Sequence, residues 1–490
     1  MSAAERTPVL IGVGALTQRE ADPTRALEPA RLMQRALEQA ADDAGSRQWL
    51  ERADAIAVPR GFWDYADPGR LVADALGAKG ARSQLAEIGV LQTTLFARAG
   101  QAIRDGEADV VLVTGGEAKQ RALLAERDGQ PAALTRQQGA APDEVWRPEA
   151  DILSPVELAS QLGTPVRQYA VIENALRAAE GQGLAAHRDD VARLWSRMSE
   201  VAASNPDAWL RERVAPEAIR DASATNRMLA FPYTKLHTSQ WNVDQAAGLI
   251  FASAAAARTA GVPESQWVHP RAVAESNAML PLVRRAELHR CPAFAVAGRR
   301  ALERAGLRVA DLEHVELYSC FPVAVRVQQR ELGLAKGRPV TLTGGMAFAG
   351  GPLNHFVLQA AVALARRLRV EPGSNGLLTA VSGMLTKQGV SVWSSRAGAA
   401  FAADDVGADA ARETATVDVA DAFAGRARVA GYTVLFERDG PADTLVLADT
   451  SDGRRAVAVG SERAFAAIAT TREIIGREVE IAGGRIRRLD

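Results

Sequence analysis

The chain has 490 residues, of which 47% are hydrophobic and 24% are charged, and its formal net charge is −1. These values are typical of a globular protein with several domains, since one domain usually spans about 150 residues. A nearly neutral chain offers no electrostatic footprint for nucleic acid or for an anionic membrane surface. No run of about 20 apolar residues predicts a transmembrane helix, and no apolar segment behind a basic start predicts a signal peptide.

The cysteine content excludes a structural zinc site. Only Cys291 and Cys320 occur, neither belongs to a C-x-x-C pair, and the six histidines are scattered. Free thiols are typical of a reducing compartment. We therefore expect a cytoplasmic protein that holds neither a metal nor a resident cofactor.

The first 117 residues alternate apolar strands with amphipathic helices. Residues 7–14 predict a buried strand, and an Ala- and Leu-rich helix follows at about 24–45. The next expected elements are a strand, two helices and a second strand, at 53–59, about 69–77, about 91–105 and 108–116. Strands that alternate with helices indicate a parallel sheet covered by helices on both faces.

The second half of the chain repeats this pattern. RALEQA at 35–40 is echoed by RALERA at 300–305, and each helix is followed by a strand that opens with Ala-Asp. Later, GLLTAVSG at 376–383 takes the place of the strand at 108–116. The shared phrase and register favour a duplication, and chance similarity between Ala-rich helices is the alternative.

Two regions depart from the repeat. Residues 118–240 are polar and helical, and they interrupt an α/β unit, which predicts an inserted lid or loop domain. Residues 396–411 read as a flexible linker. Beyond it, short runs with partial alternation are separated by turn signals, which predicts a small β-domain over 412–490; these runs are 415–420, 426–437, 444–450, 455–460 and 477–483.

Five segments in this order resemble the thiolase superfamily: AIRDGEADVVLVTGGE (102–117), VDQAAGLIFAS (243–253), the helix and strand of 293–322, GGMAFAGGPLNHF (344–356) and GLLTAVSGMLTKQGVSVW (376–393). The phrase Tyr-Ser-Cys-Phe-Pro and the tail from Val429 to Ile481 are similar to bacterial thiolase-like proteins that carry an additional C-terminal domain.

The resemblance implies a duplicated α/β fold, βαβαβαββ twice, layered α/β/α/β/α. Residues 1–117 and 241–265 would form the first half, 118–240 an inserted helical loop domain, and 266–395 the second half. Residues 412–490 would form a small all-β, OB-like domain behind the linker.

The residues that thiolase chemistry requires are missing at the aligned positions. A thiolase uses a nucleophilic thiolate at a helix N-terminus, a second thiol, and an oxyanion hole. The nucleophile aligns with Gly89, next to Val90, and the second cysteine aligns with Gly383, next to Ser382. The catalytic His aligns with Gly351.

The retained glycines permit close backbone approach to a ligand. The resemblance therefore assigns Gly89, Val90, Gly350, Gly351 and Gly383 to the binding of a CoA thioester, which would be a substrate and not a cofactor.

Few side chains remain for catalysis. Tyr318 stands where the family has a catalytic Asn or His, and its phenol could donate or shuttle a proton; a core aromatic is the alternative. His355 could reach back toward the site, or be an ordinary helix histidine. Ser382 is a third candidate. Lys387 reads most simply as a solvated hairpin lysine, and Thr93 and Thr94 as packing residues of a helix start.

Lys235 and His237 form a second candidate group for binding CoA. In an extended segment, residues i and i+2 share one face, so both could meet a phosphate or an acyl group. A solvated loop is the competing interpretation.

These residues leave three functions open. The first is an enzyme that acts on a carbon–carbon bond of an acyl-CoA thioester without an acyl-cysteine intermediate. The second is a non-catalytic acyl-CoA-binding or partner protein. The third is ordinary thiolase activity through Cys320, which is out of register with either thiolase cysteine. The resemblance also leaves open a monomer or a homodimer, and a partner of the OB-domain or hydratase type.

Overall fold

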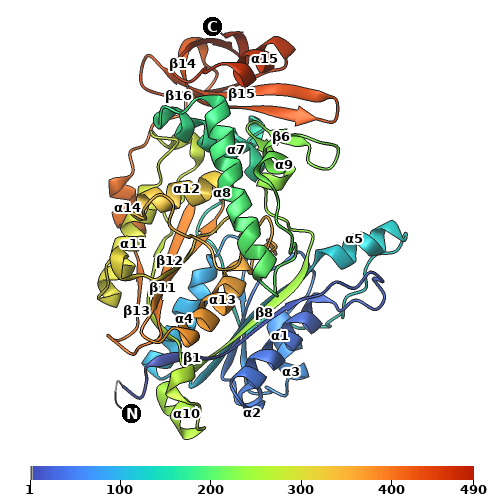
Figure 1. Ribbon diagram of the computed structural model, residues 1–490, viewed down its shortest axis with the longest axis vertical. Coiled ribbons are helices and arrows are strands. Elements are labelled where there is room, and N and C mark those ends of the chain that lie inside the picture. Colours follow the sequence, from blue (N-terminus) through green and yellow to red (C-terminus); the bar gives the residue numbers. More distant parts are fainter. Residues whose placement is uncertain (1, 3, 490) are drawn as a thin grey trace.

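The computed structural model describes residue 2 and residues 4–489, which form two stacked sheets and a separate barrel (Figure 1). The first sheet has six strands in the order β1 (Pro8–Thr17), β8 (Asp244–Ser253), β4 (Val110–Ala118), β2 (Ala55–Pro59), β3 (Arg82–Ala86) and β5 (Glu144–Trp146). Strands β4, β2, β3 and β5 are parallel neighbours, whereas β8 is antiparallel to β1 and β4. The predicted parallel sheet is therefore mixed, because β8 returns from the inserted region and not through a helical crossover.

The second sheet has five strands in the order β10 (His314–Glu316), β11 (Asn375–Ser382), β12 (Lys387–Ser394), β9 (His269–Ser276) and β13 (Ala402–Asp405). Strands β11 and β12 form an antiparallel hairpin whose last pair is Ser382 and Lys387. This hairpin carries the turn 383–386 that the sequence aligns with the second thiolase cysteine.

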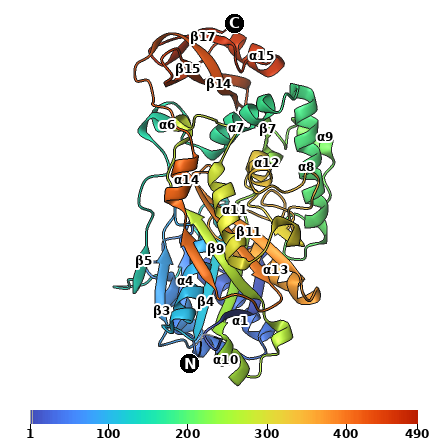
Figure 2. The same cartoon turned by 90° about the vertical axis from the view of Figure 1, so that its left-hand side faces the viewer.

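Helices occupy three layers around the two sheets. Helices α4 (Gln92–Asp105) and α13 (Phe356–Val370) contact strands of both sheets and lie between them. Helices α1 (Pro29–Asp43) and α3 (Pro68–Ala75) pack on the first sheet. Helix α11 (Pro292–Ala305) packs on the second sheet against β9 and β12, and Figure 2 shows it beside β9. This order confirms the predicted α/β/α/β/α layering.

The inserted region places two long helices across one end of the layers, α7 (Pro165–Ala179) and α8 (Leu184–Ser204). Around them are the shorter elements α5 (Lys119–Arg127), α6 (Pro155–Ala159), α9 (Pro216–Arg220), β6 (Met228–Ala230) and β7 (Tyr233–Thr234). The remaining helices of the two halves are α2 (Gln48–Glu51), α10 (Ala254–Thr259) and α12 (Pro322–Glu331).

The segment predicted as a flexible linker is ordered, and that prediction is wrong. Strand β13 pairs in parallel with β9, and α14 (Gly407–Glu413) packs against α11. Phe401 is 4% exposed and lies so close to Gly100 of α4 that a side chain at Gly100 would collide with its ring. The Ala-, Gly- and Asp-rich composition of residues 396–411 did not predict that Phe401 would be buried and would fix this segment.

The C-terminal domain is a closed five-stranded barrel. Its strands are β14 (Ala424–Glu437), β15 (Gly440–Thr450), β16 (Arg455–Gly460), β17 (Glu478–Ala482) and β18 (Arg485–Leu489). They pair in the order β14–β15–β16–β18–β17 and close through β17 and β14, with β16 and β18 parallel. A closed Greek-key barrel of five strands is the OB arrangement. Helix α15 (Arg463–Thr471), between β16 and β17, was not predicted.

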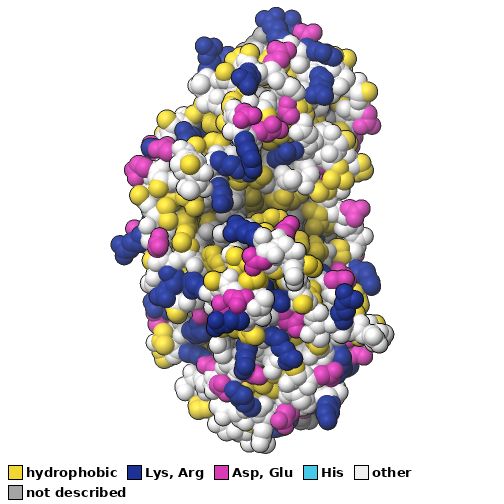
Figure 3. Space-filling model, turned by 90° about the vertical axis from the view of Figure 1, so that its right-hand side faces the viewer, with side chains coloured by type: hydrophobic (Ala, Val, Ile, Leu, Met, Phe, Trp, Pro, Cys, Tyr) yellow, Lys and Arg dark blue, Asp and Glu magenta, His cyan; other side chains and the backbone are white. Residues whose placement is uncertain are grey.

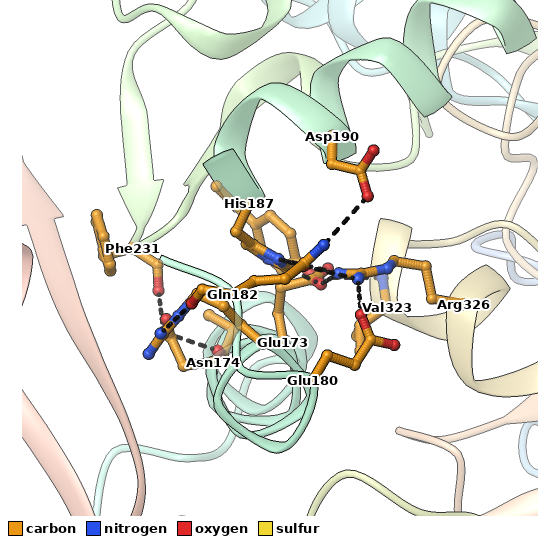
Figure 4. Close-up of polar contacts among 12 residues, drawn as sticks. Glu173, Asn174, Glu180, Gln182, His187, Asp190, Phe231, Val323 and Arg326 are labelled. Carbon is orange, nitrogen blue, oxygen red and sulfur yellow. Dashed lines mark hydrogen bonds and ion pairs between the residues drawn. The ribbon is translucent and has the colours of Figure 1, made fainter. Parts of the chain in front are cut away.

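A buried carboxylate joins the inserted region to the second half (Figure 4). Glu173 of α7 is 0% exposed; one oxygen lies 2.7 Å from Arg326 of α12 and 3.1 Å from His187 of α8, and the other accepts a hydrogen bond of 2.6 Å from Tyr233 of β7. Burial raises the pKa of Glu173, but Arg326 and the two other partners outweigh it and lower this pKa to about 2. The four residues thus hold three helices and a strand together.

We predict that Arg326→Met lowers the free energy of unfolding by about 3–5 kcal/mol, because it leaves a buried carboxylate without its cation. Adding Glu173→Gln to this variant should restore part of the loss. Because the pKa of Glu173 is about 2 when folded against an ordinary 4.5, the stabilisation is present above pH 4.5 and is lost as the pH falls toward 2. Urea unfolding at a series of pH values measures both effects.

The matched control is Arg426→Met, since Arg426 is 69% exposed and pairs with Glu478 at 3.4 Å on the barrel surface. Exposed pairs contribute about 0–1 kcal/mol. Equal losses in the two variants would contradict the role given to Glu173.

Candidate functional site

The turn before α4 has no room for a nucleophilic side chain. Gly89 has a φ of +102°, which favours glycine, and a side chain there would meet Cγ of Pro148 at 2.9 Å. Val90 is buried and its N–H donates to the Glu87 carbonyl at 3.0 Å. The packing of the inserted region against Gly89 therefore excludes a cysteine side chain at residue 89.

A lysine binds this turn. The ammonium group of Lys387, at the start of β12, donates to the Gly89 carbonyl oxygen at 2.7 Å. Lys387 is only 4% exposed, so the interpretation as a solvated hairpin lysine is wrong. Burial lowers its pKa, opposed by Glu275 and by more distant carboxylates.

A buried carboxyl group lies beside the start of α4. Glu275 of β9 is 8% exposed, accepts a hydrogen bond of 2.9 Å from Thr94, and is also bonded by the Thr93 hydroxyl. Burial raises the pKa of Glu275 to about 7, so it can gain or lose a proton near neutral pH. The two threonines therefore do more than pack, because both hold Glu275.

Tyr318 lies two residues after the end of β10. It is 8% exposed, its N–H donates to Thr379 at 2.7 Å, and its ring packs edge-on against Phe356 at 6.0 Å. Burial raises the pKa of Tyr318 far above its usual value, and the Gln92 side chain opposes this rise. The phenol therefore stays protonated at neutral pH and can donate a hydrogen bond.

The glycine loops at 350–351 and 383 pack against side chains from α7, from β8 and from the segment before β8. The hydroxyl of Tyr169 in α7 donates to the Gly383 carbonyl at 3.1 Å, and a side chain at Gly351 would lie 3.0 Å from Cβ of Ser239. Ser239 in turn donates to the Cys320 carbonyl at 3.0 Å. A side chain at Gly350, where φ is +108°, would collide with Gln245.

His355 and Ser382 lie at the edges of this group. His355 is 2% exposed and immediately precedes Phe356; burial lowers its pKa to about 3, and Nε2 has no hydrogen-bond partner among the described residues. The imidazole is therefore neutral at physiological pH. Ser382 is half-buried and pairs with Lys387 across the hairpin.

The structure thus brings four sequence-distant loops together, at Gly89, Tyr318, Gly351 and Gly383. The first and last are joined through Lys387. Helices α4 and α13 are joined by a hydrogen bond of 2.7 Å from the Val357 N–H to the Gln92 side chain. A pocket lined by all four residues stays a prediction, since none of the four lines any of the five best-formed cavities among residues 2 and 4–489.

Lys235 and His237 do not form the extended pair that the sequence predicted. Residues Lys235–His237 form a 3₁₀ turn, in which Lys235 is exposed and His237 is 3% exposed. The Thr234 N–H donates to Nδ1 of His237 at 3.1 Å, which bends the segment. Burial lowers the pKa of His237 to about 3, so it is no cation for a phosphate.

Sequence reasoning missed three residues of this group. Tyr169 is a buried tyrosine in an inserted helix, and Glu275 is one carboxylate in the strand HPRAVAES; neither belongs to a motif. Gln92 opens α4 directly after the aligned turn, and its position beside Gly89 was the one available signal.

The surface carries no single-sign patch on the face drawn in Figure 3, where basic and acidic side chains are interspersed around a hollow with hydrophobic walls. Over residues 2 and 4–489, no helix is long and apolar enough to cross a membrane. Within the same residues, no group of three or more His, Cys, Asp or Glu could hold a metal ion.

Comparison with known proteins agrees with this architecture. Residues 408–484 match the thiolase-like protein type 1 additional C-terminal domain. A monomeric SCP2-thiolase-like protein type 1 from Mycobacterium smegmatis is 26% identical, with a TM-score of 0.83 over 99% of both chains. The chain is therefore similar over its whole length to a thiolase-like protein of type 1, and residues 408–484 match the additional C-terminal domain of that type.

Two further relatives are enzymes by name. An acetyl-CoA acetyltransferase from Methanothermobacter thermautotrophicus is 25% identical over 333 residues, which cover 64% of this chain and 78% of that protein. The structure of the Ltp2-ChsH2(DUF35) aldolase is 18% identical, with a TM-score of 0.57 over 80% of this chain and 98% of that one. The second likeness supports the fold alone.

Both thiols of this chain are poor nucleophiles. Burial raises the pKa of Cys320 to about 12 and that of Cys291 to about 11. A thiolate is the reactive form, and a nucleophilic cysteine has a lowered pKa. Neither residue lies in the Gly89 turn.

We predict that iodoacetamide alkylates neither thiol of the native protein at neutral pH within the time in which it alkylates both thiols of the denatured chain. Incubation with acetyl-CoA should likewise leave no acetyl group on Cys291 or Cys320. Intact-mass spectrometry measures both outcomes. An acetylated cysteine that turns over would restore the thiolase hypothesis.

Proposed function

We propose that this chain binds an acyl-CoA thioester and acts on one of its carbon–carbon bonds without an acyl-cysteine intermediate. The observation that supports this most directly is the content of the site. Buried Lys387, Glu275 and Tyr318 surround the loops at which a thiolase holds its thiols. Buried ionisable groups with shifted pKa values gather at functional sites more often than elsewhere.

The chemistry of each group suggests its role. Tyr318 keeps its proton and would donate it to a developing alkoxide or enolate oxygen. Glu275, with a pKa of about 7, would accept or return a proton near neutral pH. Lys387 places a positive charge at the Gly89 carbonyl, where it would stabilise a developing negative charge on a thioester oxygen.

A non-catalytic acyl-CoA-binding protein is the second candidate. One observation favours it: Pro148 and Ile152 of the inserted region fill the space where side chains at Gly89 and Gly383 would lie. Tyr318 is also enclosed and lines none of the cavities described above. The two candidates make different predictions for Tyr318.

We predict that Tyr318→Phe lowers turnover of an acyl-CoA substrate by about 10²–10⁴-fold, because it removes one proton-transfer group. Binding of CoA should change little, since the substitution removes little volume. A retro-aldol and condensation screen with acyl-CoA esters, followed by calorimetry with CoA, measures the two quantities separately.

The control is Tyr432→Phe, which removes a buried hydroxyl from the barrel. It should leave turnover unchanged. If no acyl-CoA is turned over by the native protein and CoA still binds, the non-catalytic candidate holds.

We further propose that the chain works as a monomer. A relative that shares 99% of its length is monomeric, and the barrel is part of the same chain. Light scattering after gel filtration should give the mass of a single chain, with and without CoA. A dimer would revive the alternative that the two first halves associate.

A further inference from the structure

A cavity of about 280 Å³ lies against Leu385 and Thr386 of the hairpin turn 383–386, and Gly89, Tyr318, Gly351 and Gly383 do not line it. Its walls come from the loop before α11, the start of α11, the hairpin turn and helix α14. Most of the lining side chains are apolar: Ala278, Met279, Leu280, Pro292, Ala293, Leu385, Ala410 and Ala411. No aspartate or glutamate lines it.

One wall holds a buried cation without a carboxylate. Arg285 lines the cavity, is 4% exposed, and has no acidic group within ion-pair distance among the described residues. Its Nε donates to the Leu280 carbonyl, and its Nη2 donates to the carbonyls of Met384 and Leu385 at 2.9 and 3.1 Å. Its Nη1 is buried and has no hydrogen-bond partner.

The charges around the cavity leave Arg285 as the group that needs an anion. Arg290 also lines it, but Glu331 binds Arg290 at 2.6 Å and accepts the Cys291 N–H at 3.1 Å. Glu157 acts on Arg285 only from beyond ion-pair distance. Burial of a guanidinium without a counter-charge destabilises the folded chain, and a carboxylate is the usual partner of such a group.

We infer that this cavity is a binding site for a small aliphatic monocarboxylate, whose carboxylate meets Arg285 and whose tail fills the apolar walls. The chemistry of the walls separates this ligand from an inorganic anion, which would gain nothing from apolar contact. The buried Nη1 of Arg285 likewise disfavours a neutral lipid, which would leave this nitrogen without a hydrogen-bond partner. The inference does not rest on the function proposed above, although Thr386 and Gln388 of the cavity wall flank Lys387.

Because the cavity lies against the hairpin turn, binding of a ligand should be measurable from amide exchange in that turn. Leu385 has a φ of +55°, and its carbonyl accepts hydrogen bonds from Arg285 and, at 2.7 Å, from Gln388. A ligand against Leu385 and Thr386 would slow amide exchange in this turn. Exchange in the barrel should not change.

The experiment compares hexanoate with hexan-1-ol, acetate and inorganic phosphate on the full chain. Hexanoate should bind at least about tenfold more tightly than each of the three, raise the Tm, and protect the amides of 384–388. Equal binding of hexanol and hexanoate overturns the role of Arg285. Equal binding of phosphate or acetate overturns the role of the apolar walls, and no hexanoate binding at millimolar concentration overturns the site.

Two variants locate the ligand. Arg285→Gln should abolish hexanoate binding, but it also removes bonds to three carbonyls and can unfold the loop. Ala293→Leu fills the cavity from the first turn of α11 and leaves Arg285 intact, and it should weaken hexanoate at least about tenfold. Ala295→Leu is the matched control on the same helix, because Ala295 does not line this cavity. Unchanged binding in Ala293→Leu contradicts the inference.

Discussion

The burial of one carboxylate, Glu173, fixes the helix on which the site and the barrel both depend. Tyr169, Glu173 and Arg177 follow one another at intervals of four along α7, so they share one face of the helix. The first donates to the Gly383 turn, the second binds Arg326, and the third forms an ion pair with Glu473 of the barrel. A charge can be buried at Glu173 only while its partners hold it, and this requirement sets the position of the other two residues.

Helix α7 also attaches the additional C-terminal domain. Asn174, next to Glu173, donates to the carbonyls of Phe231 and Tyr432 at 3.0 and 3.1 Å, and β6 pairs with β14. The inserted region and the barrel therefore pack as neighbours although more than 240 residues separate α7 from β14 along the chain. Along α7 the contact is polar at Asn174 and Arg177, and apolar at Val171, which lies against Gly431.

Sequence alone predicted the layers of the fold because its signals are local. The repeated RALE phrase marks α1 and α11, and the glycine-rich motifs mark the turns at 89, 350–351 and 383. What it could not predict depends on partners far along the chain. Phe401 looks like one aromatic in a linker until Gly100 is placed beneath it. Lys387 looks exposed until the Gly89 carbonyl, 298 residues earlier, is placed beside it.

The absence of cysteines at residues 89 and 383 and the filling of the site by the inserted region therefore have the same structural cause. A cysteine at residue 89 would have to displace Pro148, and a side chain at residue 383 would have to displace Ile152. Both residues belong to the inserted region, and Ile152 lies at Gly383, whose carbonyl accepts a hydrogen bond from Tyr169 of α7. A thioester carbonyl placed against Gly89 needs the space that Pro148 fills, so catalysis at this site requires the segment 148–152 to withdraw. Weakening the Glu173 network should ease that movement, and if the site is catalytic, mild Arg326 variants would change substrate binding as well as stability.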